Sequence, residues 1–147
     1  MAKLTLKDEL LCVQAALPDD ASETTVTDAI QLKGGVDPQG GFYAECELLV
    51  TVPALSATIL PAASGNNAAG SLTVAIQTSD TDDSDGWSGS TSLTLATIVG
   101  GTSGGAAAQE IRHRFLTDVK KFVRVSFTTN STATDASAVT AEACLVF

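Results

Sequence analysis

The strongest constraint on this chain is a two-residue alternation of apolar and polar side chains that recurs from residue 26 to the C-terminus. Successive side chains of a β-strand point to opposite faces, so this alternation predicts strands with one buried face each. The clearest case lies in residues 42–51. There one face holds Phe42, Ala44, Cys46, Leu48 and Val50. The pattern predicts an all-β chain.

Further strands are predicted wherever the alternation returns. They span residues 26–32, 72–77, 93–99, 110–115, 122–127 and 139–147, with a short additional one at 57–60. Segments rich in Gly, Ser, Asp, Asn and Pro separate them, as turns require. Seven or eight strands of this kind indicate an antiparallel β-sandwich, and a meander, an immunoglobulin-like sandwich and a jelly roll all fit.

The first twenty residues are expected to differ from the rest. Residues 4–17 mix helical and extended character. Any helix or strand that forms there is expected to end at Pro18, Asp19 and Asp20. We therefore interpret residues 1–20 as an N-terminal tail or short helix, followed by one β-sandwich domain over residues 21–147.

Charge excludes some partners and favours others. The net charge of −9 repels phosphate backbones, so no nucleic-acid partner is expected. Charged residues make up only 17% of the chain against about 25% in typical soluble domains. Such a weakly charged surface predicts that other subunits cover part of it. The charged opening residues and the lack of a long apolar run predict no export through a signal peptide and no membrane partner.

The cysteines and the histidine point away from catalysis. Cys12, Cys46 and Cys144 are few and dispersed, which predicts free thiols rather than a disulfide framework or a zinc site. Cys46 is expected to be a small buried hydrophobe. His113, the single histidine, lies between two arginines and is interpreted as a core or interface residue. No nucleophile or phosphate-binding motif accompanies it, so neither an enzyme nor a cofactor is expected.

The loop over residues 79–91 carries two features of interest. Its acidic run resembles half of a calcium loop, but aligning Gly86 with the obligatory glycine puts Thr81 and Ser92 where acidic ligands belong. Trp87, the single tryptophan, has three open interpretations. It tucks against the sandwich edge, anchors a protein contact or stacks on a sugar.

Three stretches carry a family resemblance. Asp8-Glu9-Leu10-Leu11 followed by Val13-Gln14-Ala15 forms the first, and residues 72–80 (LTVAIQTSD) form the second. The third joins residues 121–125 (KFVRV) to the closing segment 139–145. In this order they resemble the jelly-roll capsid cement, or decoration, proteins of short-tailed bacteriophages.

The resemblance implies a jelly-roll sandwich that forms a homo-oligomer, a dimer or a trimer. It further implies a structural virion protein that binds the major capsid protein on the outer capsid surface, locks neighbouring capsomers, and is made in the host cytoplasm. The alternative is a carbohydrate-binding or adhesion module that uses Trp87 and Tyr43. The candidate protein-contact residues are Leu4, Leu6, Leu10, Leu11, Trp87, Phe122, Arg124 and Phe147, and the candidate contact regions are residues 1–17, 61–70, 79–91 and 99–108.

Overall fold

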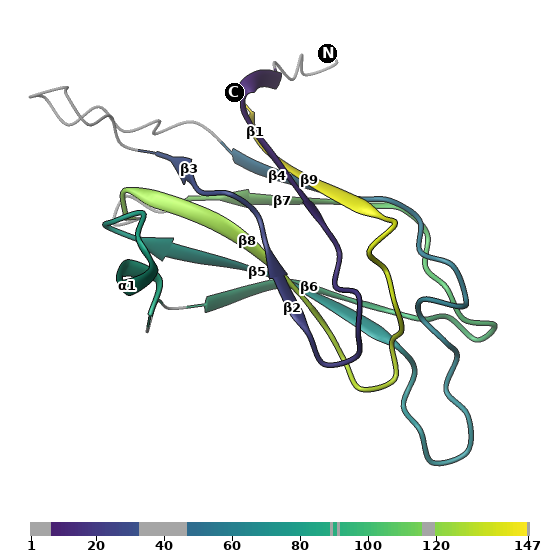
Figure 1. The fold of residues 1–147 in the computed structure, drawn as a ribbon. Helices are drawn as coiled ribbons and strands as arrows, with labels where there is room; N and C mark the ends of the chain where they lie inside the picture. Colours follow the sequence, from purple (N-terminus) through teal and green to yellow (C-terminus); the bar gives the residue numbers. More distant parts are fainter. Residues whose placement is uncertain (1–6, 33–46, 89, 91, 116–119, 147) are drawn as a thin grey trace, which may run out of the picture.

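Two antiparallel β-sheets face each other in the computed structural model of the chain, which describes residues 7–32, 47–88, 90, 92–115 and 120–146 (Figure 1). Sheet A has the strand order β1 (Lys7–Ala16), β9 (Thr140–Val146), β4 (Glu47–Val52) and β7 (Gln109–Arg114). Sheet B has the order β2 (Thr24–Val26), β8 (Phe122–Thr129), β5 (Ser71–Ser79) and β6 (Ser92–Val99). The short strand β3 (Ile30–Gln31) also pairs with β8, and α1 (Ser84–Trp87) is a single helical turn.

The strand pairs are nested along the chain. β1 pairs with β9, β2 and β3 with β8, β4 with β7, and β5 with β6. A long hairpin rolled onto itself produces this nesting, and it defines the jelly roll. The predicted β-sandwich is confirmed, and the pairing selects the jelly roll from the three topologies that periodicity left open.

The core lies between the sheets and follows the predicted alternation in most strands, but in β6 Leu93 and Val99 are exposed whereas Ile98 is buried. Leu48 and Val50 of sheet A are fully buried, as are Leu72 and Val74 of sheet B. Phe127 of β8 is the largest fully buried side chain. Each of these residues lies one position from a neighbour that points out of the sandwich, so the register of every strand decides which face meets solvent.

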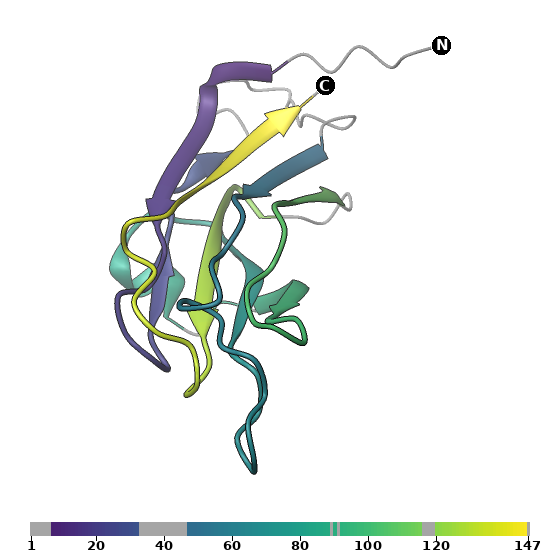
Figure 2. The same cartoon turned by 90° about the vertical axis from the view of Figure 1, so that its right-hand side faces the viewer.

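The N-terminal expectation is wrong for residues 7–16, which form β1 and pair with the C-terminal strand β9 (Figure 2). Leu11, Val13 and Ala15 pack against the core. Pairing with β9 therefore determines the secondary structure of this segment, whose local preference is mixed. Burying this row of apolar side chains against the core favours a strand over a tail or helix.

Three local expectations also change. Residues 57–60 form a turn rather than a strand, closed by a 3.0 Å bond from Leu60 N to Ser56 O. The segment 26–32 is divided into β2 and β3. Between them, the Thr27 amide donates a hydrogen bond to Val125 O, and the Thr27 hydroxyl accepts one from Val125 N. The register of β6 shifts between Thr94 and Ala96, which makes Leu95 a β-bulge.

In the described part of the chain, no helix has the length and apolar character needed to cross a membrane.

Candidate protein interface

The outer face of sheet B is almost free of charge. Across β2, β3, β5, β6 and β8 the only charged side chain is Arg124. Because Leu72, Val74 and Ile76 point into the core, the alternate residues of β5 point outward. These are Ser71, Thr73, Ala75, Gln77 and Ser79, of which Ala75 and Ser79 are covered by the chain itself. A face of this kind offers hydroxyls and small apolar groups without a charge that must be desolvated.

A row of four threonines crosses this outer face. The registers place Thr24 beside Thr128, Thr128 beside Thr73, and Thr73 beside Thr97. The row therefore spans four of the five strands of sheet B. The hydroxyls of Thr24 and Thr128 share a 2.8 Å hydrogen bond, which fixes the geometry at one end. We call these four residues the threonine row.

An open hollow of about 440 Å³ lies where the outer face of sheet B meets the loop that holds α1. Arg124 lies over the Trp87 ring, with its guanidinium carbon 4.3 Å from the ring centre, and donates from Nε to Gln77 Oε1 at 2.8 Å. Asp82 accepts from the Trp87 indole at 3.2 Å. Burial lowers the pKa of Arg124, and the nearby Asp82 carboxylate opposes that shift. The guanidinium stays charged and fixed in place.

Trp87 is 8% exposed, so the chain itself covers most of its ring. This agrees with the interpretation that Trp87 tucks against the sandwich. Asp83 accepts a 2.6 Å bond from the Gly86 amide, and so begins the helical turn that positions the indole. Among the side chains described in this acidic loop, no three carboxylates come close enough together to hold a metal ion.

The outer face of sheet A has a different character. Glu47, Glu142, Glu110 and Arg112 occupy outward positions, on strands whose alternate residues are buried or point inward. Arg112 and Glu47 form an ion pair at 3.6 Å, and Gln14 donates to Glu142 at 3.1 Å. The charges on this face are therefore partly satisfied within the chain.

One edge of sheet B is formed by β6, and this strand is uncharged from end to end. Leu93 is 51% exposed and Val99 is 53% exposed, the two highest values among large apolar side chains in the described residues. The neighbouring edge of sheet A is β7, whose sequence QEIRHR alternates charge with apolar residues. Charged edges resist pairing with another strand, whereas uncharged ones invite it.

The predicted contact residues divide into three groups. Trp87 and Arg124 line the hollow, and Phe122 lies two residues from Arg124 on the same face of β8. Leu11 packs against the core of its own domain, and Leu10 lies in β1. Leu4, Leu6 and Phe147, together with Tyr43 and Cys46, lie outside the described residues. Sequence reasoning missed the threonine row, because only the register brings its members together.

The candidate loops gather at two ends of the sandwich. Residues 61–70 form a loop whose tip is exposed, held at its base by a 2.8 Å bond from Gly70 N to Pro61 O (Figure 2). Residues 99–108 lie against the turn at 55–60 through a bond from Gly105 N to Leu60 O at 2.7 Å. Gly105 has a φ of +72° and its Cα approaches that turn closely, so a larger residue would clash. The 79–91 loop lies at the other end (Figure 1).

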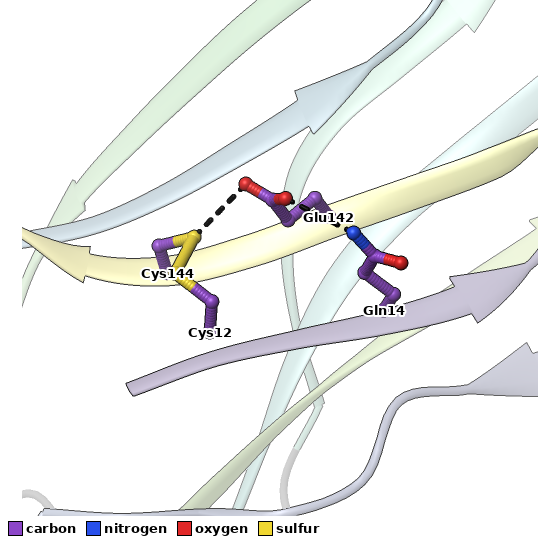
Figure 3. The surroundings of a disulfide bond; sticks show 4 residues. All are labelled: Cys12, Gln14, Glu142 and Cys144. Carbon is purple, nitrogen blue, oxygen red and sulfur yellow. Dashed lines mark hydrogen bonds between the residues drawn. A yellow bond between two sulfur atoms is a disulfide. The ribbon is translucent and has the colours of Figure 1, made fainter. Parts of the chain in front are cut away.

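The expectation of free thiols is wrong for two of the three cysteines. Cys12 of β1 and Cys144 of β9 form a disulfide across a sequence separation of 132 residues (Figure 3). The two residues are direct partners in the β1–β9 register. Because strand pairing, not sequence proximity, brings the cysteines together, their spacing gave no sign of the bond.

His113 agrees with its interpretation as a core or interface residue. It lies opposite the buried Leu48 in the β4–β7 register and meets Phe115 edge to face, with ring centres 5.5 Å apart. Burial lowers the pKa of the imidazole, which favours its neutral form at pH 7.

No protein-family model matches the chain, and no curated protein matches it.

Proposed function

We propose that the chain is a structural virion protein, a capsid cement protein that binds the outside of a bacteriophage shell and stabilises contacts between capsomers. The observation that carries the proposal is the nearly uncharged outer face of sheet B with its threonine row. The resemblance of residues 8–11 with 13–15, of residues 72–80, and of residues 121–125 with 139–145 to cement proteins supports it.

The outer face of sheet B suits a broad, flat protein partner. Burying a charge without a partner costs several kcal/mol, and this face has a single charge, Arg124, which is already held by Gln77 and Trp87. The threonine hydroxyls can donate and accept hydrogen bonds to main-chain groups of the major capsid protein. The acidic character of the chain keeps it from packaged nucleic acid and complements basic patches on a shell.

The size of this face implies more than one contact per assembly. Four strands spaced about 4.8 Å apart and about seven residues long cover roughly 400 Å². A stable interface usually buries about 800 Å² on each partner. A homo-oligomer that presents two or three such faces to a repeating shell would multiply the effective affinity.

The β6 edge is where a second copy fits this proposal. Antiparallel pairing of β6 with its equivalent would continue sheet B and cover the exposed Leu93 and Val99. It would also set two β7 strands side by side in opposite directions. The acidic end of one, at Glu110, would then approach the basic end of the other, at Arg114. This gives a dimer; a trimer would need a different contact.

The binding test uses capsids that lack decoration and a matched pair of variants. Thr73→Lys places a charge in the threonine row, and Thr51→Lys places the same charge on the outer face of sheet A, between Glu110 and Glu142. We expect the wild-type chain and Thr51→Lys to co-sediment with capsids and raise the shell's melting temperature. Thr73→Lys should bind at least about tenfold more weakly, the equivalent of about 1.4 kcal/mol.

Two outcomes would contradict the proposal. Equal binding by both variants would remove the outer face of sheet B from the interface. Failure of the wild-type chain to bind capsids, together with binding on glycan arrays, would favour the carbohydrate-binding or adhesion alternative. The oligomer is tested separately by sedimentation at micromolar concentration, where Leu93→Glu should shift a dimer to a monomer.

A further inference from the structure

The outer face of sheet A holds two cross-strand pairs that lie next to each other. Cys12 faces Cys144, and two residues along both strands Gln14 faces Glu142 (Figure 3). One ligand atom each from Cys12, Cys144 and Glu142 lies within 4.8 Å of the other two. Among the residues that the structure describes, no other three side chains with metal-binding groups come so close together.

The position of the Glu142 carboxylate suits a state other than the disulfide. Its Oε1 atom lies 3.1 Å from Cys144 Sγ, a separation at which a thiol would donate a hydrogen bond. A disulfide sulfur has no proton to donate. A carboxylate beside two sulfur atoms is stabilised by a thiol proton or by a cation that it shares with them, whereas a disulfide offers it neither.

The three groups match the preferences of a thiophilic divalent cation. Zn²⁺ binds Cys sulfur at about 2.3 Å and carboxylate oxygen at about 2.0–2.2 Å, so the sulfur atoms of a tetrahedral site lie roughly 3.8 Å apart. The register keeps Cys12 and Cys144 opposite each other, with their Cα atoms 4.1 Å apart. Once the bond between them is broken, small side-chain rotations reach the required separation. A water molecule would complete the tetrahedron.

The surroundings already orient one of the ligands. Gln14 Nε2 donates to Glu142 Oε2 at 3.1 Å and leaves Oε1 directed at the sulfur atoms (Figure 3). Hydrogen bonds of this kind to a ligating carboxylate are a regular part of metal sites. Cys144 is 1% exposed, whereas Cys12 and Glu142 are half-buried, so a cation can enter from the solvent side.

We propose that in the reduced protein Cys12, Cys144 and Glu142 bind one Zn²⁺ ion, which joins β1 to β9 in place of the disulfide. A dithiol reagent supplies two electrons and two protons to open the Cys12–Cys144 bond and is itself oxidised to its cyclic disulfide. Zn²⁺ then displaces the two thiol protons. Either state of the pair cross-links the first and last strands of the jelly roll. The site is independent of the capsid proposal.

Cobalt titration of the full chain tests the site, because Co²⁺ adopts the zinc geometry and gives a thiolate charge-transfer absorption band. The protein is reduced with a dithiol and desalted under nitrogen. We expect one Co²⁺ per chain in the reduced protein, displaced by Zn²⁺, and no band in the oxidised protein. Zn²⁺ should also raise the melting temperature of the reduced chain towards that of the oxidised chain.

Variants then identify the ligands. Cys12→Ser should weaken Co²⁺ binding by at least about a hundredfold, and Glu142→Gln by at least about tenfold, with Gln14→Ala lowering affinity about tenfold through Glu142. Cys46→Ser and Glu110→Gln are the matched controls and should bind as the wild type does.

The proposal is overturned if the reduced wild-type chain gives no band, or if Cys12→Ser or Glu142→Gln binds normally. Loss of the band in Cys46→Ser would overturn it as well. The comparison of oxidised and reduced wild-type protein does not depend on whether any variant folds.

Discussion

The outer faces of the two sheets differ in how many of their side chains form bonds within the chain. Sheet A has a disulfide, an ion pair between Arg112 and Glu47, and a hydrogen bond between Gln14 and Glu142. Sheet B has hydroxyl groups, small side chains and one arginine, with few charges for the chain to pair. One jelly roll thus has a face whose polar groups pair with each other and a face that holds almost no charge. The first should govern stability and the second should govern association.

The largest expected effect concerns the cross-link on sheet A. Cys12→Ser removes the only disulfide between described residues, which joins strands 132 residues apart. The loss of a constraint over so long a loop should lower the free energy of unfolding by about 2–5 kcal/mol. Denaturant unfolding in the absence of metal measures it, with Cys46→Ser as the control. A midpoint equal to that of the oxidised wild type would show that sheet A does not depend on the bond.

The next effect compares one arginine on each face. Arg124→Ala removes both the contact with Trp87 and the bond to Gln77, and should cost about 1–2 kcal/mol. Arg112→Ala removes only an exposed ion pair and should cost less than about 1 kcal/mol. Fluorescence of the single tryptophan provides a second measurement, since only Arg124→Ala should expose the indole. An unchanged emission spectrum in that variant would mean that Arg124 does not cover the ring.

A smaller effect is expected from the two lysine variants used in the binding test. Thr51→Lys gains two acidic cross-strand neighbours, Glu110 and Glu142, and should be stabilised by a few tenths of a kcal/mol. Thr73→Lys gains none and should change stability by less than about 0.5 kcal/mol. Thermal melts of both variants check this. A loss of several kcal/mol in Thr73→Lys would mean that the threonine row serves folding rather than association.

The smallest effect follows from His113, whose pKa is lowered by burial. Because the folded chain binds fewer protons there than the unfolded chain, this contribution to stability is present above the ordinary histidine pKa of 6.5. It is lost progressively as the pH falls below that value. Melting temperatures between pH 8 and pH 5 should therefore fall more in the wild type than in His113→Asn. Parallel curves would show that the imidazole is as solvated in the folded chain as in the unfolded one.

Alternation predicted the core but not the surface pattern. The inward positions of Leu48, Val50, Leu72 and Val74 follow directly from the two-residue period, and all are buried. The period does not reveal which strands are neighbours. The threonine row and the Cys12–Cys144 pair depend on that information, so neither could be predicted from spacing. The bulge at Leu95 shifts the register of β6 by a single residue, which no sequence signal marked.

Local signals were least informative where tertiary contacts decide the structure. Residues 7–16 have mixed preferences, and pairing with β9 makes them a strand. Trp87, Phe122 and Arg124 were predicted as contact residues one by one. The structure brings Trp87 and Arg124 together, because the α1 loop folds back over the outer face of β8.

The most direct test of the difference between the two faces is hydrogen–deuterium exchange on the chain bound to capsids that lack decoration. We expect slower exchange over residues 24–26 of β2, which hold Thr24 of the threonine row, and in the loop over residues 79–88 when the chain is bound. Exchange over residues 109–114 of β7 should be unchanged. Protection of β7 and of residues 140–146, with no change in β2, would contradict the account by placing the interface on sheet A.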